Sequence, residues 1–349
     1  MRILHIIFSL YGGGSENLLI DTVNEQVKSE EVTVIIINDC LRQSLINEID
    51  KRVKVVLLNR KPQSKNPFVI IRLNYLLFRI KPNVIHIHHL SISKIICRNF
   101  HKRLFYTIHA LNIPMALSKY VKCMIAISNA VKENTAHRTN TPIITIPNGI
   151  NTDKIRHKFH KDIDKEETFK IIQLGELNIE IKGQDILIEA ISILRNKGIN
   201  NISVDFIGDG KDRMSLEKLT KEMGLCNNIK FLGQKNRDYI YSNLKDYDLM
   251  CHPSRSEGFG LVIAEGLAAG LPILVPDAGG PYEVIERGKY GCTFTNENAE
   301  DCAAKIEYIM NNYKEVSEKY QDGRKYVIEK YSIRKMTREY INVYKENLK

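Results

Sequence analysis

Two carboxylates eight positions apart give the strongest chemical signal in the chain. Glu257 and Glu265 lie within residues 254–270, SRSEGFGLVIAEGLAAG, where most other residues are glycine, alanine or large aliphatics. A carboxylate among such close-packing residues is partly buried, and burial requires that hydrogen-bond donors meet it. Two interpretations are open. Either Glu257 caps a helix and Glu265 is a fortuitous acid, or both accept hydrogen bonds from a polyhydroxylated ligand.

The elements around these carboxylates follow from the same stretch. Residues 247–254, YDLMCHPS, are predicted to form a strand. A helix begins at about Gly260 and ends before Gly270, a residue suited to the left-handed end of a helix. In the ligand-binding interpretation, the free N–H groups of Gly258, Phe259 and Gly260 bind the ligand's phosphates.

Two further segments suit an anion. Gly12, Gly13 and Gly14 follow the first predicted strand, and N–H groups at a helix start favour a phosphate, with a purely structural turn as the alternative. Lys182 is predicted at the start of another helix, where it either reaches a phosphate or is a plain surface lysine. Asn17 stands where a dinucleotide fingerprint requires glycine, which argues against a nicotinamide dehydrogenase.

Histidines end two of the predicted strands. His86 and His88 are two positions apart in a strand, so they share a face that could ligate a metal ion. No acid lies near them in the sequence, and a ring buried against backbone is the commoner use, so we expect no metal. His109 follows an apolar strand and begins a loop, where we expect it to face a cleft.

Short apolar runs alternate with longer amphipathic segments along the chain, a pattern typical of βα units and parallel sheets. Residues 148–169 interrupt it with a polar, charged stretch that suits a domain boundary. We predict an α/β protein with two Rossmann-like, doubly wound parallel-sheet domains facing a cleft, over 1–160 and 161–330, and a helix over 331–349 that returns to the first domain. Ligands of such sheets bind at the carboxyl ends of the strands.

Composition narrows the class further. Hydrophobic content of 43% and charged content of 26% over 349 residues are globular values. Seven cysteines with no CxxC pair indicate reduced thiols in a cytoplasmic protein. Residues 1–16 run from an apolar segment directly into glycines without a cleavage site, so we expect a buried strand there rather than a signal peptide. No run approaches the roughly 18 apolar residues of a membrane-spanning helix.

Positive charge is concentrated in the first half of the chain. Between Lys51 and Lys132 there are 16 basic residues and no acidic one. Within this region residues 67–82, PFVIIRLNYLLFRIKP, are amphipathic and basic, which suits the surface of an anionic bilayer. A core helix with a solvated basic face is the alternative. No nucleic-acid-binding motif is present and tryptophan is absent, so we do not expect a nucleic-acid partner.

Taken together, these motifs resemble retaining GT-B glycosyltransferases of family 4 (glycosyl transferases group 1). Glu257 to Glu265 matches the family's E-x7-E element within PSRSEGFGLVIAEGLAAGLPILVPDAGGPYEVI. Five other segments match in order along nearly the whole chain: GGGSE, IPNGINTDKI, KGQDILIEA, FIGDG and NIKFLG. Six ordered matches are more specific than any one of them.

The resemblance implies an N-terminal acceptor-binding domain, a C-terminal nucleotide-sugar-binding domain, and neither a metal ion nor a cofactor. By position, Glu257 contacts the donor sugar, Glu265 binds the ribose hydroxyls and Lys182 neutralises the diphosphate. His109 is implied to lie beside the transferred sugar, so Glu257 and His109 are the implied catalytic residues. The other implied donor-binding residues are Gly13, Gly14, Gly258, Phe259, Gly260 and Leu261.

One position departs from the family. Six residues before Lys182 the family usually has arginine, whereas this chain has Glu176. An acid beside a diphosphate is repulsive, so either Glu176 points away or another cation supplies the charge, with Arg255 as the candidate.

The expected protein is a retaining hexosyl- or N-acetylhexosaminyltransferase that is cytoplasmic and peripheral on the inner face of the membrane. We expect it to move a sugar from a UDP-sugar, in preference to a GDP-sugar, to a lipid-linked saccharide in capsule or O-antigen biosynthesis. The alternatives are a soluble acceptor or a catalytically silent subunit that only binds a nucleotide or a partner.

Overall fold

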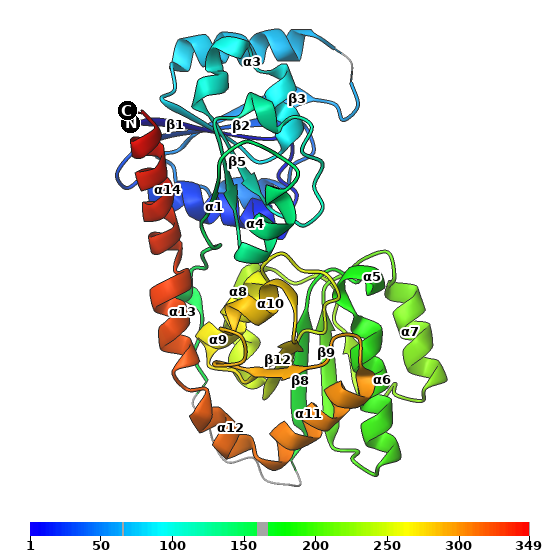
Figure 1. Cartoon of the computed structure of the whole chain (residues 1–349). Helices are drawn as coiled ribbons and strands as arrows, with labels where there is room; N and C mark the ends of the chain where they lie inside the picture. The colour runs from blue at the N-terminus through cyan, green and yellow to red at the C-terminus, as the bar shows by residue number, and fades with distance from the viewer. Residues whose placement is uncertain (65, 159–166, 349) are drawn as a thin grey trace. The chain divides into compact units, whose positions relative to one another are not determined.

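The computed structural model describes residues 1–64, 66–158 and 167–348. The chain divides into two compact units (Figure 1). Unit 1 comprises Met1–Ile150 with Ile333–Lys349, and unit 2 comprises Asn151–Ser332. The boundary expected between residues 160 and 161 lies outside the described residues.

Unit 1 is built on a parallel seven-stranded sheet in the order β3-β2-β1-β4-β5-β6-β7. The strands are β1 (Arg2–Ile7), β2 (Glu31–Asn38), β3 (Lys54–Arg60), β4 (Val84–Ile87), β5 (Leu104–Ile108), β6 (Cys123–Ala126) and β7 (Ile143–Thr145). The α-helices are α1 (Gly14–Gln26), α2 (Gln43–Asn47), α3 (Phe68–Ile80), α4 (Asn129–Ala136) and α14 (Ile333–Leu348).

The strands of unit 1 are almost continuously apolar because helices cover the sheet. Ile3, Val84 and Phe105 from three neighbouring strands share one core cluster with residues of α1 and α14. Only sheets buried on both faces read as unbroken apolar runs. The strand order reverses between β1 and β4, so the carboxyl ends of these two strands flank the position where such sheets bind ligands.

Unit 2 repeats this plan with a parallel six-stranded sheet in the order β10-β9-β8-β11-β12-β13. Its strands are β8 (Phe169–Leu174), β9 (Ile202–Ile207), β10 (Ile229–Phe231), β11 (Leu249–Cys251), β12 (Ile273–Pro276) and β13 (Cys292–Phe294). Its α-helices are α5 (Ile179–Lys182), α6 (Gln184–Asn196), α7 (Arg213–Glu222), α8 (Arg237–Asn243), α9 (Leu261–Ala269), α10 (Gly279–Val284), α11 (Ala299–Asn311), α12 (Tyr313–Lys319) and α13 (Gly323–Tyr331).

The order of the second sheet reverses between β8 and β11, which places a second ligand position at their carboxyl ends. Two doubly wound parallel sheets confirm the predicted fold class.

The last helix, α14, belongs to unit 1. Ile333 N–H donates to the carbonyl of Ile150 over 2.9 Å, and a Cβ at Gly149 would lie only 2.7 Å from Ile333 Cα. Glycine at 149 therefore allows this close approach. The rings of Tyr340 and Tyr344 are buried in the unit 1 core.

Among the described residues, no helix is both long and apolar enough to cross a membrane. All seven cysteines lie within the described part of the chain and carry free thiols.

Candidate active site

Three polar side chains meet at the carboxyl ends of β8 and β11 in unit 2. Lys182 Nζ donates to Glu257 Oε2, and His252 Nε2 lies 3.6 Å from the same oxygen. Lys182 ends α5, His252 directly follows β11, and Glu257 stands in the loop before α9. Gly175, the residue after β8, has φ +149°, a backbone conformation that residues with side chains rarely adopt, and the Lys182 stem packs beside it. The position where the strand order reverses, which we call the switch point of the sheet, thus carries a lysine, a histidine and a carboxylate.

The protonation states of these three side chains depend on their burial and on their contacts with one another. Burial alone would raise the pKa of Glu257, but the nearby His252 imidazole and the charge of Lys182 together lower it to about 2. Burial lowers the pKa of His252, and Glu257 only partly opposes this. The cluster at neutral pH is therefore a lysine cation and a carboxylate beside a neutral imidazole.

His252 is a site residue that the sequence analysis missed. Its side chain is buried, and neither ring nitrogen has a hydrogen-bond partner within the described residues. The sequence around His252, a histidine followed by Pro-Ser, does not indicate a site, because only the tertiary structure brings this residue against Lys182 and Glu257.

The loop from Glu257 to Gly260 is held close to the first turn of α10. Gly280 N–H donates to the Glu257 carbonyl over 3.0 Å, and a Cβ at Gly280 would lie 2.4 Å from Phe259 N. The ring of Phe259 is buried against Tyr331. Backbone packing and the buried ring of Phe259 therefore hold the loop in place.

The helix after this loop has the predicted limits. α9 runs from Leu261 to Ala269, between Gly260 at φ +90° and Gly270 at φ +80°. Its close packing on the sheet is confirmed, because a Cβ at Gly266 would lie 2.7 Å from Met250 Sδ. The helix can approach the sheet this closely only with glycine at that position.

Glu265 is half-buried on α9 and is met by a donor, as expected for a carboxylate in such packing. Tyr241 Oη donates to Glu265 Oε1 over 2.9 Å, and Arg237 Nη2 donates to the same Tyr241 oxygen over 3.0 Å. Glu265 is thus held in position by α8 rather than packed by chance.

Lys182 differs slightly from its predicted place. It closes the short helix α5 instead of opening the next one, and Gly183 at φ +60° separates it from α6. The carbonyl of Lys182 accepts from Gln173 Nε2 over 3.0 Å, which fixes the backbone beneath the side chain.

Arg255, the expected substitute cation, is committed to another partner. Its two terminal nitrogens bind the carboxylate of Asp185 at 2.7 and 2.8 Å, and Nη1 also donates to the Ile179 carbonyl. This bidentate pair raises the pKa of Arg255 and ties the loop before α9 to α6. We therefore treat Arg255 as a structural residue.

Glu176 has an exposed side chain, while its carbonyl accepts from Gln184 Nε2 over 2.8 Å. The pKa of Lys211 is raised chiefly by its hydrogen bond with Glu180, and the charge of Glu176 adds to this effect. The negative charge of Glu176 thus acts partly on Lys211, which faces the solvent.

The N–H groups of the glycine-rich loop in unit 1 donate to a carboxylate of the chain itself, that of Glu16. Glu16 Oε2 accepts from the N–H groups of Tyr11, Gly12 and Gly13, with nitrogen–oxygen distances of 2.7 Å from Tyr11 and 2.9 Å from Gly13. Gly13 is the N-cap of α1, and Gly14 is its first residue. The expectation that these N–H groups are open to a phosphate needs correction, because the carboxylate of Glu16, in the first turn of α1, already accepts from them.

The histidines of unit 1 are joined by hydrogen bonds. His86 contacts Tyr344 Oη and Thr107 Oγ1 through its two ring nitrogens. His88 Nε2 lies 3.1 Å from His5 Nδ1, and His88 Nδ1 lies 3.4 Å from His109 Nε2. These contacts use the ring nitrogens of His86 and His88 that the metal interpretation would need. In the described part of the chain, no group of three or more His, Cys, Asp or Glu residues is arranged to hold a metal ion.

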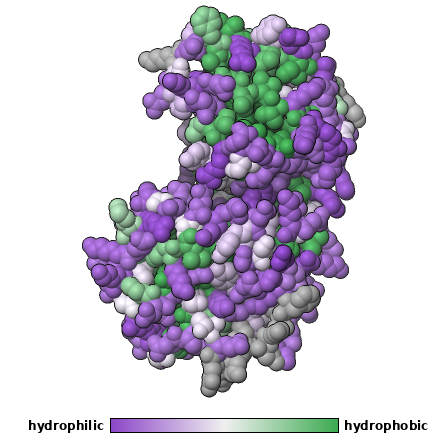
Figure 2. Space-filling model, turned by 180° about the vertical axis from the view of Figure 1, so that it is seen from behind, coloured by the Kyte–Doolittle hydropathy of each residue, from purple (hydrophilic) through white to green (hydrophobic). Residues whose placement is uncertain are grey.

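The exposed face of α3 is apolar. Only Leu73 and Leu77 are buried, so the helix is not the core helix of the alternative interpretation. The large apolar side chains of α3 that are more than half exposed are Phe68 (73%), Ile71 (61%), Tyr75 (57%) and Phe78 (52%). Figure 2 shows that apolar side chains gather most extensively on unit 1. We call these four residues the α3 apolar face.

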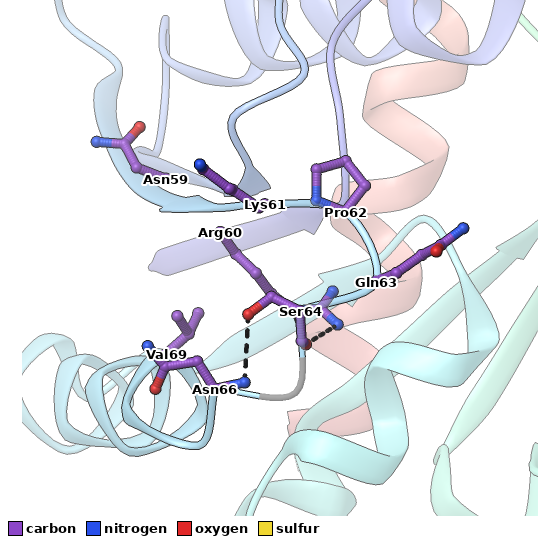
Figure 3. A pocket seen from close by; sticks show the side chains of 8 residues that line it. All are labelled: Asn59, Arg60, Lys61, Pro62, Gln63, Ser64, Asn66 and Val69. Atoms are coloured by element: carbon purple, nitrogen blue, oxygen red, sulfur yellow. Dashed lines mark hydrogen bonds between the residues drawn. The ribbon is translucent and has the colours of Figure 1, made fainter.

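A cavity of about 470 Å³ lies where the loop after β3 enters α3 (Figure 3). Arg60 Nη2 donates to the Ser64 carbonyl over 2.7 Å and thereby closes this loop on itself. The described lining residues are Asn59, Arg60, Lys61, Pro62, Gln63, Ser64, Asn66 and Val69. The cavity is polar and basic, in contrast to the adjoining apolar face.

Comparison with known proteins defines the class. The model of the glycosyl transferases group 1 matches residues 141–329, and that of Glycosyltransferase Family 4 matches residues 12–154. The chain belongs to this family. It is a nucleotide-sugar-dependent glycosyltransferase with the GT-B fold.

Particular relatives agree with this assignment. An uncharacterized glycosyltransferase from Methanocaldococcus jannaschii is 30% identical over 279 residues, which are 76% of this chain and 69% of that protein. The O-antigen biosynthesis glycosyltransferase WbnH from Escherichia coli is 32% identical over 171 residues, or 48% of this chain and 46% of that protein. The crystal structure of Anabaena HepE in complex with UDP and glucose shares the fold with a TM-score of 0.83 at 18% identity, covering 99% of this chain and 100% of that one.

Proposed function

We propose that this glycosyltransferase moves a hexosyl or N-acetylhexosaminyl group from a UDP-sugar, with retention, to a lipid-linked saccharide of a surface glycan. The observation that carries the donor side is the meeting of Lys182, Glu257 and His252 at the switch point of unit 2. The HepE structure contains UDP and glucose, and WbnH acts in O-antigen biosynthesis, which supports a UDP-sugar and a surface glycan.

Each donor-side residue has a role in the chemistry. The bond between the anomeric carbon and the diphosphate oxygen breaks, and the acceptor oxygen bonds to that carbon while the acceptor's proton passes to the departing diphosphate. Lys182 and the N–H groups from Gly258 to Leu261 stabilise the negative charge that develops on the departing diphosphate. To do so, Lys182 exchanges part of its contact with Glu257 for the phosphate. No protein nucleophile is assigned, because retention in this family is thought to proceed by front-face attack.

The carboxylates recognise hydroxyl groups. Glu257, ionised because its pKa is near 2, is an acceptor for hydroxyls of the donor sugar. Glu265, which is held by Tyr241, is assigned to the ribose hydroxyls. We also assign His109 to the transferred sugar, as the family resemblance implies.

The α3 apolar face supports a lipid-linked acceptor. An exposed helix face with three aromatic rings suits the interfacial layer of a membrane, and Arg72 and Arg79 on the same helix suit anionic head groups. We propose that the enzyme binds peripherally at the inner face of the membrane, with unit 1 taking the acceptor.

A donor screen tests this function. The purified chain is incubated with UDP- and GDP-sugars, with and without a lipid-linked saccharide extract, and release of the nucleoside diphosphate is measured. We expect turnover with one UDP-sugar, accelerated by the extract, and a loss of at least 100-fold in kcat/KM for Lys182→Ala. The exposed Lys170→Ala variant is the matched control and retains activity.

Other outcomes separate the alternatives. Turnover with a water-soluble saccharide but not with the lipid extract would point to a soluble acceptor. Nucleotide binding without turnover for any donor and acceptor would overturn the proposed transfer reaction.

A further inference from the structure

Four imidazole rings from three neighbouring strands stack beside one another in unit 1. His5 lies in β1, His86 in β4, His88 directly after β4, and His109 directly after β5. The rings of His86 and His88 are 4.9 Å apart at 10°, and those of His88 and His109 are 5.7 Å apart at 20°. Parallel strands in the order β1-β4-β5 place these side chains in a row at one edge of the sheet.

Hydrogen bonds run through this row in one direction. Gln26 Oε1 lies 2.7 Å from His5 Nε2, His5 Nδ1 lies 3.1 Å from His88 Nε2, and His88 Nδ1 lies 3.4 Å from His109 Nε2. Gln26 and His5 are fully buried, whereas His109 is only partly buried. The chain thus begins in the core on an amide oxygen and ends on the histidine nearest the solvent.

The amide oxygen sets the protonation of every ring. It can only accept, so His5 carries its proton on Nε2 and offers the lone pair of Nδ1. His88 must then donate from Nε2 and accept at Nδ1, and His109 must donate from Nε2. The lone pair of His109 is therefore left on Nδ1. A neutral imidazole has one donor and one acceptor, so each link fixes the next.

We infer that Gln26, His5 and His88 are positioning residues that hold His109 as the neutral Nε2–H tautomer, with Nδ1 as an acceptor for a hydroxyl group of the transferred sugar. The tautomer follows from the contacts within unit 1, and the sugar contact rests on the proposed function. Burial lowers the pKa of both His5 and His109 to about 4, and burial also lowers the pKa of His88. Neutral rings are what a directional chain of this kind requires.

Two His88 variants separate positioning from mere packing. In His88→Gln, the side-chain amide can still donate to His5 and its oxygen can still accept from His109, whereas His88→Leu interrupts the chain at a partly exposed position. We expect His88→Leu to lower kcat about tenfold with little change in the donor KM, and His88→Gln to recover most of this loss. The exposed His137→Leu is the control for loss of a histidine elsewhere in unit 1.

Nitrogen NMR of the full chain labelled with ¹⁵N-histidine reads the tautomers directly. We expect His109 to show a protonated Nε2 and an unprotonated Nδ1 in the wild type and in His88→Gln, and a mixture of tautomers in His88→Leu. A protonated Nδ1 in the wild type, or a single unchanged tautomer in His88→Leu, would overturn the inference. If the wild type shows the predicted tautomer but the His109→Ala enzyme is as active as the wild type, the positioning chain stands. Only the sugar contact of the proposed function is then refuted.

Discussion

Lys182 and Glu257 form an ion pair across 75 positions of the chain, and the side chain of each is 20% exposed. Their pairing joins the end of α5 to the loop before α9. A cation and an anion that neutralise each other in this way keep the site compact until a ligand with its own negative charge competes for the lysine.

The stability provided by this pair should depend on pH. The folded-state pKa of Glu257 is about 2, below its ordinary value of 4.5, so the stabilisation is present above pH 4.5 and is lost as the pH falls towards 2. Urea unfolding of the wild type and of the Lys182→Met/Glu257→Gln double variant measures it. We expect the difference in unfolding free energy to be larger at pH 6 than at pH 3, and an equal difference at both values would contradict the assignment.

Gly266→Ala should destabilise unit 2. The added Cβ would lie 2.7 Å from Met250 Sδ and 2.8 Å from Ile273 Cδ1, so α9 or the sheet must shift, at a cost of about 1–3 kcal/mol. Gly13→Ala is the matched control, because Gly13 has a negative φ and its Cβ would meet only Glu16 Oε2, at 4.0 Å. Chemical unfolding should show a loss for the first variant and none for the second.

Glu16→Ala should convert the glycine-rich loop into an open anion site. Removing the carboxylate leaves the N–H groups of Tyr11, Gly12 and Gly13 without their acceptor, which costs about 1 kcal/mol of stability. Millimolar inorganic phosphate should then raise the Tm of the variant more than that of the wild type. The control is Glu25→Ala at the other end of α1, which removes an acid paired with Lys28. Equal phosphate responses in all three proteins would refute the site.

Serine substitutions in the α3 apolar face should weaken membrane binding. Phe68→Ser and Ile71→Ser each remove an exposed apolar side chain, and we expect each to reduce binding to phosphatidylserine-containing vesicles about tenfold in sedimentation assays. Met214→Ser, at an 81% exposed position in unit 2, is the control. Binding should fall with added salt, because Arg72 and Arg79 contribute, yet should not vanish. Unchanged binding of both α3 variants would exclude this face.

Much of the fold could be predicted from local patterns. Apolar runs predicted the parallel sheets, and Gly260 and Gly270 predicted the limits of α9, because these features depend on residues close together in the sequence. The acid at Glu265 was expected to need a donor, but that donor, Tyr241, comes from another helix.

The contacts that could not be predicted join distant segments. Arg255 pairs with Asp185, 70 positions away, which no local pattern reveals. His5 and His88 meet only because β1 and β4 are neighbours, and strand order is not encoded in any one strand. Glu16 could have been recognised as a capping acid, since it lies three residues after the N-cap glycine.

The return of the chain to unit 1 affects the order in which the protein can be completed during synthesis. Unit 2 is contiguous, whereas unit 1 needs α14, which follows unit 2 in the chain. Until α14 emerges from the ribosome, His86 lacks Tyr344 and the buried hydroxyl of Thr107 lacks Tyr340. All of unit 2 is therefore synthesised before α14, and the domain whose strands are made first is the last to acquire its finished core.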